Sequence, residues 1–219
     1  MARLLFEKTG NALWISHLDL MRLFQRAFKR AGLNLKHTQG FNPRPSVSIA
    51  LPLSVGVESC CELLDFDLEG ETATCEEILQ RLNHALVRGV KVLSVYEDGR
   101  KIRDLALLEC TVKMEYDNGV EEDTLQEIRQ LFARETLAVT KKGKNGLVQQ
   151  DIIPMIRKIH IELADHHTVV IRALVCCQNP SLNPAQLVSA VETYLPNRKP
   201  DYALCARNEI FDTNEVIFR

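Results

Sequence analysis

The most pronounced chemical pattern in the sequence is a group of four cations in one amphipathic segment. They recur at i, i+4, i+7 and i+8, which places them along one side of an α-helix. Their positions are Arg22, Arg26, Lys29 and Arg30. Guanidinium and ammonium groups both suit phosphate oxygens. The spacing therefore predicts an anion-binding stripe with RNA as its leading ligand, and the alternative interpretation is a helix face that is simply hydrated.

A short expected strand and a Gly- and Pro-rich loop follow this helix and add further polar and cationic side chains. Those within reach of a ligand held by the stripe are Lys36, His37, Gln39, Asn42 and Arg44. We expect the cations to hold phosphates, and the amides of Gln39 and Asn42 to contact sugar or base edges. In the alternative interpretation, residues 41–45 dock a protein partner and the cations meet an acidic protein surface.

Charge is distributed unevenly along the chain. Residues 1–50 hold eight Lys/Arg against two Asp/Glu, a balance of 8 − 2 = +6. The whole chain has a net charge of −2, so the remainder sums to −8. This asymmetry favours an anionic partner for the first fifty residues.

Ser16, His17 and Asp19 lie together at the start of the expected helix. Ser16 has the position of an N-cap, and Asp19 would sit at the electropositive helix end. A hydrolase or nuclease that uses His17 with Asp19 is a further alternative. Residues this close on a capped helix point in different directions, however, which does not favour a catalytic triad.

The sequence holds no recognisable catalytic or metal-binding motif. Its seven cysteines are scattered or adjacent and never form a CxxC pair, which excludes the usual zinc-ribbon and radical-cluster spacings. Phosphate-binding GxxxxGK and dinucleotide-binding GxGxxG runs are also missing from it. We therefore predict no catalytic residue, no metal and no cofactor. An aromatic-rich RNA-recognition strand is missing too, so backbone contacts are expected to dominate any RNA binding.

Composition indicates an ordinary globular protein. Apolar residues make up 46% of the chain and charged residues 26%. Neither a secretory leader nor an apolar run of membrane-spanning length is evident. An odd number of unordered cysteines favours reduced thiols. A cytoplasmic location without membrane contact is the expectation.

The elements that must position these residues follow from hydrophobic periodicity. A helix is expected over residues 17–31, with Gly32 as its C-terminal stop, and a short strand over 33–37 follows it. A second helix is expected over 73–86, capped by Thr74. Residues 1–99 then read strand–helix–strand–strand–helix–strand, and residues 104–219 repeat the rhythm. The prediction is an α+β fold of two tandem ferredoxin-like (split βαβ) units, with antiparallel sheets and helices on one face.

Several segments of the sequence form a recognisable set: residues 6–10, 16–22, 26–32, 40–43, 51–59 and 62–65, with weaker traces at 150–154 and 181–184. Together they resemble the radical-SAM-linked protein family, a domain of unknown function. Members of that family occur alone or fused behind a radical-SAM enzyme, often beside genes for ribonuclease G and ribosomal proteins. Because this chain lacks cluster cysteines, the resemblance implies a stand-alone accessory protein whose radical-SAM partner is a separate polypeptide.

The function expected from these observations is a non-catalytic RNA-binding adaptor. It would present ribosomal or transfer RNA to a radical-SAM modifying enzyme. The second hypothesis is a protein–protein scaffold that docks the radical-SAM partner without binding RNA. The hydrolase that uses His17 and Asp19 is the third. A small anionic ligand at the basic site, the identity of the RNA and the oligomeric state all stay open.

Overall fold

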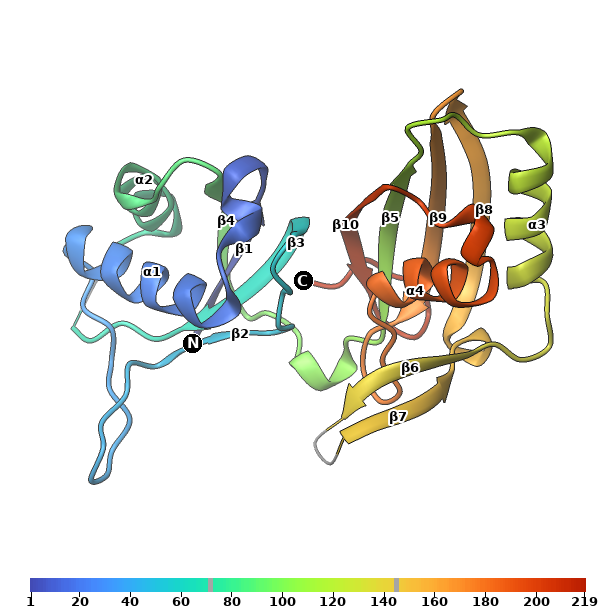
Figure 1. The fold of residues 1–219 in the computed structure, drawn as a ribbon. Helices are drawn as coiled ribbons and strands as arrows, with labels where there is room; N and C mark the ends of the chain where they lie inside the picture. The colour runs from blue at the N-terminus through green and yellow to red at the C-terminus, as the bar shows by residue number, and fades with distance from the viewer. Residues whose placement is uncertain (71–72, 144–145) are drawn as a thin grey trace. The chain divides into compact units, whose positions relative to one another are not determined.

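A computed structural model of the 219-residue chain describes residues 1–70, 73–143 and 146–219. The chain forms two compact units. Unit 1 consists of Met1–Asp104 together with Phe218–Arg219, and unit 2 consists of Leu105–Ile217. Each unit combines an antiparallel sheet with two α-helices (Figure 1), which confirms the predicted α+β class.

Unit 1 is built on a four-stranded antiparallel sheet with strand order β4-β1-β3-β2. Two short 3-10 helices, Gly10–Trp14 and Ile102–Asp104, complete the unit. Its elements in chain order are β1 (Ala2–Lys8), α1 (His17–Arg30), β2 (Val47–Ile49), β3 (Val57–Phe66), α2 (Cys75–Ala85) and β4 (Val90–Glu97).

The core of unit 1 lies between the sheet and one face of α1. Phe24 and Phe28 of this helix are fully buried. The Phe24 ring meets Phe6 of β1 edge-on, with centroids 4.7 Å apart, and the Phe28 ring lies 4.9 Å from that of Phe66 in β3. Aromatic pairs at this separation add to the free energy gained by burying their area. These two pairs fix the rotation of α1 about its own axis.

Both helices of unit 1 begin with the caps that the sequence predicts. The Ser16 hydroxyl accepts a hydrogen bond from the backbone N–H of Asp19, and α1 begins at His17. Thr74 and Glu77 form a reciprocal capping box before α2. At the other end of α1, the Arg81 guanidinium of α2 donates to the carbonyl oxygens of Ala31 and Gly32, each at 2.9 Å.

The expected strand over residues 33–37 is wrong. This segment makes only isolated bridges, from Leu35 to Leu68 and from His37 to Pro45. Its backbone N–H and C=O groups are shared between β3's continuation and the returning chain: Lys36 N–H donates to the Asp67 carbonyl, and Ser46 N–H donates to the Lys36 carbonyl. The result is the stem of a projecting hairpin (Figure 1).

The last two residues belong to unit 1, whereas residues 104–219 were all expected in the second unit. Phe218 is fully buried. The guanidinium carbons of Arg3 and Arg100 lie 5.7 and 4.6 Å from the centre of its ring. The backbone of Arg100 donates to the carbonyl oxygen of Arg219 at 3.0 Å. Burial of one aromatic ring under two guanidinium groups accounts for the return of the chain.

Unit 2 is built on a second antiparallel sheet, with strand order β10-β5-β9-β8. The described residues of β6 and β7 pair in a separate two-stranded ribbon. The elements are β5 (Leu107–Glu115), α3 (Glu122–Phe132), β6 (Ala138–Gly143), β7 (Gly146–Asp151), β8 (Ile156–Asp165), β9 (Thr168–Cys176), α4 (Ala185–Tyr194) and β10 (Tyr202–Phe211).

The helices of unit 2 pack on one face of its sheet. Ile128 and Leu131 of α3, and Leu187 and Val191 of α4, are almost fully buried. Arg129 of α3 donates twice to the carbonyl oxygen of Ile161 in β8, at 2.9 and 3.2 Å. Within the residues that the structure describes, no helix is long and apolar enough to cross a membrane.

The 3-10 helix Gly10–Trp14 packs closely against Gly89, which directly precedes β4. Its φ is +90°, and a Cβ atom there would lie 2.6 Å from the Thr9 carbonyl oxygen and 2.9 Å from the Ala12 Cβ. We expect Gly89→Ala to lower the free energy of unfolding by about 3 kcal/mol or more, because strain and overlap add. Urea unfolding followed by circular dichroism measures the change.

Gly10→Ala is the matched control for this variant. Gly10 also has a positive φ (+56°), but nothing lies within 4 Å of its Cβ position. Only the backbone strain remains there, a cost of about 1–2 kcal/mol. Equal losses in the two variants would contradict the close approach at Gly89.

Candidate nucleic-acid interface

The predicted cations of α1 are all exposed, because the opposite face of the helix is buried in the core. They face different neighbours, however. The Arg30 guanidinium turns toward α2 and donates to the Ala85 carbonyl oxygen at 2.7 Å. Lys29 lies at the other edge of the cationic stripe, where it lines a groove beside the hairpin stem. One residue of helix advances about 100°, so neighbours in sequence separate at once.

The hairpin after α1 carries the remaining predicted residues. Its neck is closed by Thr38, whose N–H donates to the Arg44 carbonyl at 2.8 Å and whose hydroxyl accepts from the Arg44 N–H at 3.0 Å. The side chains of Gln39, Asn42 and Arg44 are exposed around the tip. Gly40 at the turn has a φ of +136°, which glycine alone adopts without strain. Phe41 stands fully exposed, at 107% of its reference surface.

Most of the nine predicted binding side chains make no hydrogen bond or ion pair with the described residues. Arg30 is held by Ala85, and Arg22 donates to Asp19 at 2.9 Å in an exposed ion pair. In residues 1–70, 73–143 and 146–219 the other seven side chains make no hydrogen bond or ion pair. They are Arg26, Lys29, Lys36, His37, Gln39, Asn42 and Arg44. Exposed cations without a partner are available to an anion.

The Ser16, His17 and Asp19 cluster does not form a catalytic arrangement. The Asp19 carboxylate accepts hydrogen bonds from Ser16 at 2.7 Å and from Arg22, and not from His17. Those two donors, Ser16 first, hold the pKa of the Asp19 carboxyl below its usual range. The Nδ1 atom of His17 is buried without a hydrogen-bond partner among the described residues. A carboxylate this well satisfied is a poor general base near neutral pH.

The part of the chain that the structure describes contains no candidate metal site. No group of three or more His, Cys, Asp or Glu side chains is placed to hold an ion there. Burial raises the pKa of the Cys110 thiol to about 12 and that of Cys205 to about 11. These thiols therefore stay protonated at neutral pH, which suits packing and not metal binding or nucleophilic attack.

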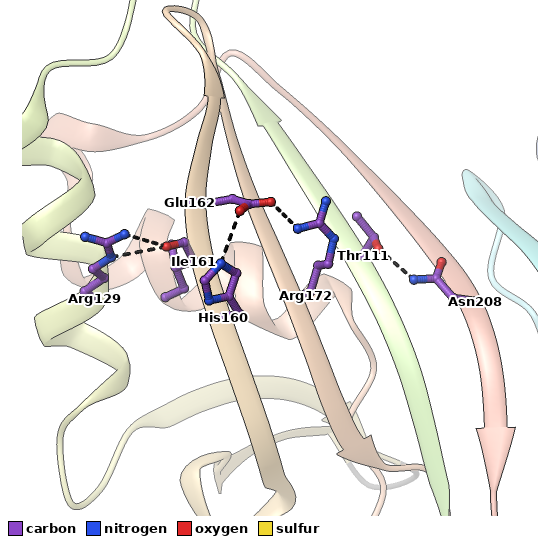
Figure 2. A network of polar contacts seen from close by, with 7 residues as sticks. All are labelled: Thr111, Arg129, His160, Ile161, Glu162, Arg172 and Asn208. Carbon is purple, nitrogen blue, oxygen red and sulfur yellow. Dashed lines mark hydrogen bonds and ion pairs between the residues drawn. The ribbon is translucent and has the colours of Figure 1, made fainter. Parts of the chain in front are cut away.

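The open face of the unit 2 sheet carries a polar network that the sequence analysis did not anticipate (Figure 2). Glu162 of β8 accepts from His160 at 3.1 Å and pairs with Arg172 of β9. Asn208 of β10 donates to the Thr111 hydroxyl at 2.7 Å. Arg172 and then His160 lower the pKa of the Glu162 carboxyl. Alternation along a strand puts i and i+2 on one face, but their cross-strand partners could not be read from the sequence.

This network is a less favourable anion-binding site than the cations of α1 and the hairpin in unit 1. The carboxylate of Glu162 neutralises the guanidinium of Arg172. Lys158 in the same strand pairs with Glu215. Among the described residues, Arg22 is the one cation of α1 and the hairpin that forms an ion pair, and Arg26 interacts at longer range with the same carboxylate, Asp19. The interface predicted from sequence is therefore the more favourable place for an anionic polymer.

The groove beside Lys29 adds residues that the sequence analysis missed. It has a volume of about 390 Å³ and lies between α1 and the stem of the hairpin, entirely within unit 1. Gln25, Asn34 and Glu69 contribute polar side chains to its walls. They are far apart in sequence and carry no motif, so only the pairing of residues 34 and 35 with residues 68 and 69 brings them together.

The sequence matches the family described as "uncharacterized protein conserved in bacteria (DUF2344)" over residues 2–184. The chain belongs to this family. Among curated proteins there is no match to the sequence. The family assignment agrees with the resemblance to a domain of unknown function, and nothing in it links the chain to radical-SAM enzymes.

Two solved structures are similar to the chain at low identity. The first is the crystal structure of a Cbf5-Nop10-Gar1 complex, at 11% identity and a TM-score of 0.49. The match covers 95% of this chain and 48% of that one, so the chain spans about half the length of this relative. The second is an unknown protein from Galdieria sulphuraria, at 15% identity and a TM-score of 0.26, covering 94% and 95%.

Titration of Asp19 checks the geometry at the start of α1. We expect Ser16→Ala to raise the pKa of this carboxyl toward its ordinary value, because the first of its two donors is lost. The stability that comes from the hydrogen bond between the Ser16 hydroxyl and the Asp19 carboxylate is present at neutral pH and is lost as the pH falls through the lowered pKa. Carbon-detected NMR of the carboxyl measures the shift.

Arg22→Ala is the companion variant, and it should also raise the pKa of Asp19. It keeps the Ser16 cap, whereas Ser16→Ala also costs about 1 kcal/mol of stability. An unchanged Asp19 titration in Ser16→Ala would show that the hydroxyl does not hold the carboxylate in solution.

Proposed function

We propose that the protein is a non-catalytic, cytoplasmic RNA-binding adaptor for ribosomal or transfer RNA. Its contact surface is formed by α1 and the hairpin that follows it, in unit 1. Arg22, Arg26, Lys29, Lys36 and Arg44 hold phosphates, and Arg30 assists from the α2 side. Gln39 and Asn42 contact sugar or base edges, and His37 reaches a phosphate or a base.

One observation carries this proposal. Seven of the nine side chains are exposed and have no hydrogen bond or ion pair within the described ranges. Arg22, Arg172 and Lys158, by contrast, each pair with a carboxylate. A cluster without such partners, in a segment with a charge balance of +6, has the composition of a polyanion contact.

The proposal extends to the architecture. Both units are of the ferredoxin-like type, with helices on one face of an antiparallel sheet. Support comes from the element order, strand–helix–strand–strand–helix–strand in each unit once the β6–β7 ribbon is set aside. The strand orders β4-β1-β3-β2 and β10-β5-β9-β8 support it as well, because each places the first and third strands at the centre.

The radical-SAM part of the proposal rests on the sequence resemblance alone. The chain carries no cysteine spacing that would hold an iron–sulfur cluster. A radical-SAM modifying enzyme would therefore act as a separate polypeptide, and the protein described here would bring RNA to it. This partnership is independent of the RNA-binding step and is tested separately.

Binding of RNA across a salt series tests the adaptor. If about four phosphates of a single strand are neutralised, affinity falls by about 50-fold between 50 and 200 mM salt. Arg22→Glu/Arg26→Glu should reduce affinity by about tenfold or more and flatten the salt dependence, because two contacts become repulsive. Fluorescence anisotropy with labelled RNA and with duplex DNA of the same length gives both quantities.

Lys113→Glu/Arg157→Glu is the matched control. Both side chains are exposed in unit 2, and the change in net charge is the same. This variant should bind RNA almost as the parent does. If the two double variants lose equal affinity, the attraction is non-specific and the α1 assignment fails.

A scaffold that docks a protein partner is the second candidate, and the full exposure of Phe41 favours it. An exposed aromatic ring at the tip of a projecting hairpin is a common anchor for a protein pocket. Capture of a co-expressed radical-SAM enzyme should then be nearly independent of salt and should be lost in Phe41→Ala. Capture that persists in Phe41→Ala would exclude this docking mode.

A further inference from the structure

The groove beside α1 has a construction that phosphate binding does not explain. Its volume is about 390 Å³, at the small end of the range for ligand pockets. It adjoins the cationic surface of α1 through Lys29, which belongs to both. The groove opens at the foot of the hairpin that carries Gln39, Asn42 and Arg44 at its tip.

The backbone fixes the shape of the groove. Gly32 ends α1 with a φ of +69°, and the chain then turns back along the helix. Leu35 bridges Leu68, and the Glu69 N–H donates to the Asn34 carbonyl oxygen at 2.9 Å. These contacts lie between main-chain atoms. The walls are therefore formed without any use of the polar side chains that face the groove.

Those side chains are open to solvent, because one is half-buried and the other four are exposed. The groove is lined by two amides, a carboxylate, an imidazole and an ammonium group: Gln25, Asn34, Glu69, His37 and Lys29. Across the described part of the chain, none of the five makes a side-chain hydrogen bond or ion pair. Five hydrogen-bonding groups around one hollow are an arrangement that a polar ligand would satisfy.

The remaining lining is apolar. Leu35 is almost fully buried and Pro45 is half-buried at the foot of the hairpin, and the Phe28 ring lies beneath them in the core. A planar heterocycle can rest on such a floor while its edge reaches the polar rim. One carboxylate against one ammonium group also makes the groove nearly neutral, so it suits a base better than a phosphate.

We propose that this groove binds one unpaired nucleobase of the RNA, a step that rests on the proposed function. Asn and Gln amides pair with base edges through a donor and an acceptor at once. Glu69 accepts from an exocyclic amino group, and Lys29 meets the phosphate at the mouth of the groove. Since a base in a duplex cannot present its pairing edge, the protein selects single-stranded loops or ends over continuous helix.

The variant Gln25→Ala/Asn34→Ala tests the groove without altering any charge. We expect its affinity for a single-stranded RNA oligonucleotide to fall about tenfold, because the amide contacts to the base edge are lost. Affinity for the same strand annealed to its complement should be unchanged, as should the salt dependence. Gln130→Ala is the control, because Gln130 is an uncharged amide exposed on α3, in unit 2.

The outcomes separate the groove from the wider function. If Gln25→Ala/Asn34→Ala binds single-stranded RNA as the parent does, while Arg22→Glu/Arg26→Glu does not, the groove assignment is overturned and the RNA-binding proposal stands. Equal affinity of the parent for single strand and duplex also overturns it.

A titration with the four nucleoside 5′-monophosphates, followed by NMR shifts of groove residues, covers the remaining case. If the parent binds a monophosphate but no RNA, the groove is a site for a free nucleotide and the RNA-binding proposal fails. If it binds neither, both proposals fail.

Discussion

The packing of α1 against the sheet of unit 1 is the interaction on which the surface chemistry depends. Phe24 on Phe6, and Phe28 on Phe66, leave the helix one rotation about its axis. The buried residues of α1 recur at the three-to-four spacing, and the four cations lie on the exposed side of the helix. The cationic surface therefore needs no dedicated scaffold, because it is the complement of the aromatic core.

The end of α1 matters as much as its face. Arg81 holds the last carbonyl groups of the helix, and Gly32 turns the chain back beside it. The hairpin starts from this fixed point, so its stem lies close to the helix while its tip extends away (Figure 1). The stem, held by main-chain hydrogen bonds, and the exposed tip divide the surface into two parts: a groove with fixed walls, and a loop whose side chains point into solvent.

Features that depend on neighbouring residues could be predicted from the sequence, whereas features that depend on long-range pairing could not. The helix starts at Ser16 and Thr74 were predicted because capping depends on a few adjacent residues. Strand β7 was not predicted, since its side chains are mostly exposed and do not alternate between buried and exposed. The groove could not be foreseen because Asn34 and Glu69 meet only through a main-chain hydrogen bond 35 residues apart. Helical spacing predicted that the four cations of α1 face away from the core. Only the structure shows that Lys29 lines the groove while Arg30 contacts α2.

The burial of Phe218 in unit 1 gives the chain an unusual order of completion during synthesis. A ribosome makes the N-terminal portion first, yet that unit receives its last aromatic side chain only after all of Leu105–Ile217 has been translated. Unit 2 is continuous in sequence and can fold as it emerges. Until then, unit 1 lacks the Phe218 ring that packs beside Arg3 and Arg100. Co-translational folding would thus finish in the reverse of the order in which the two units begin.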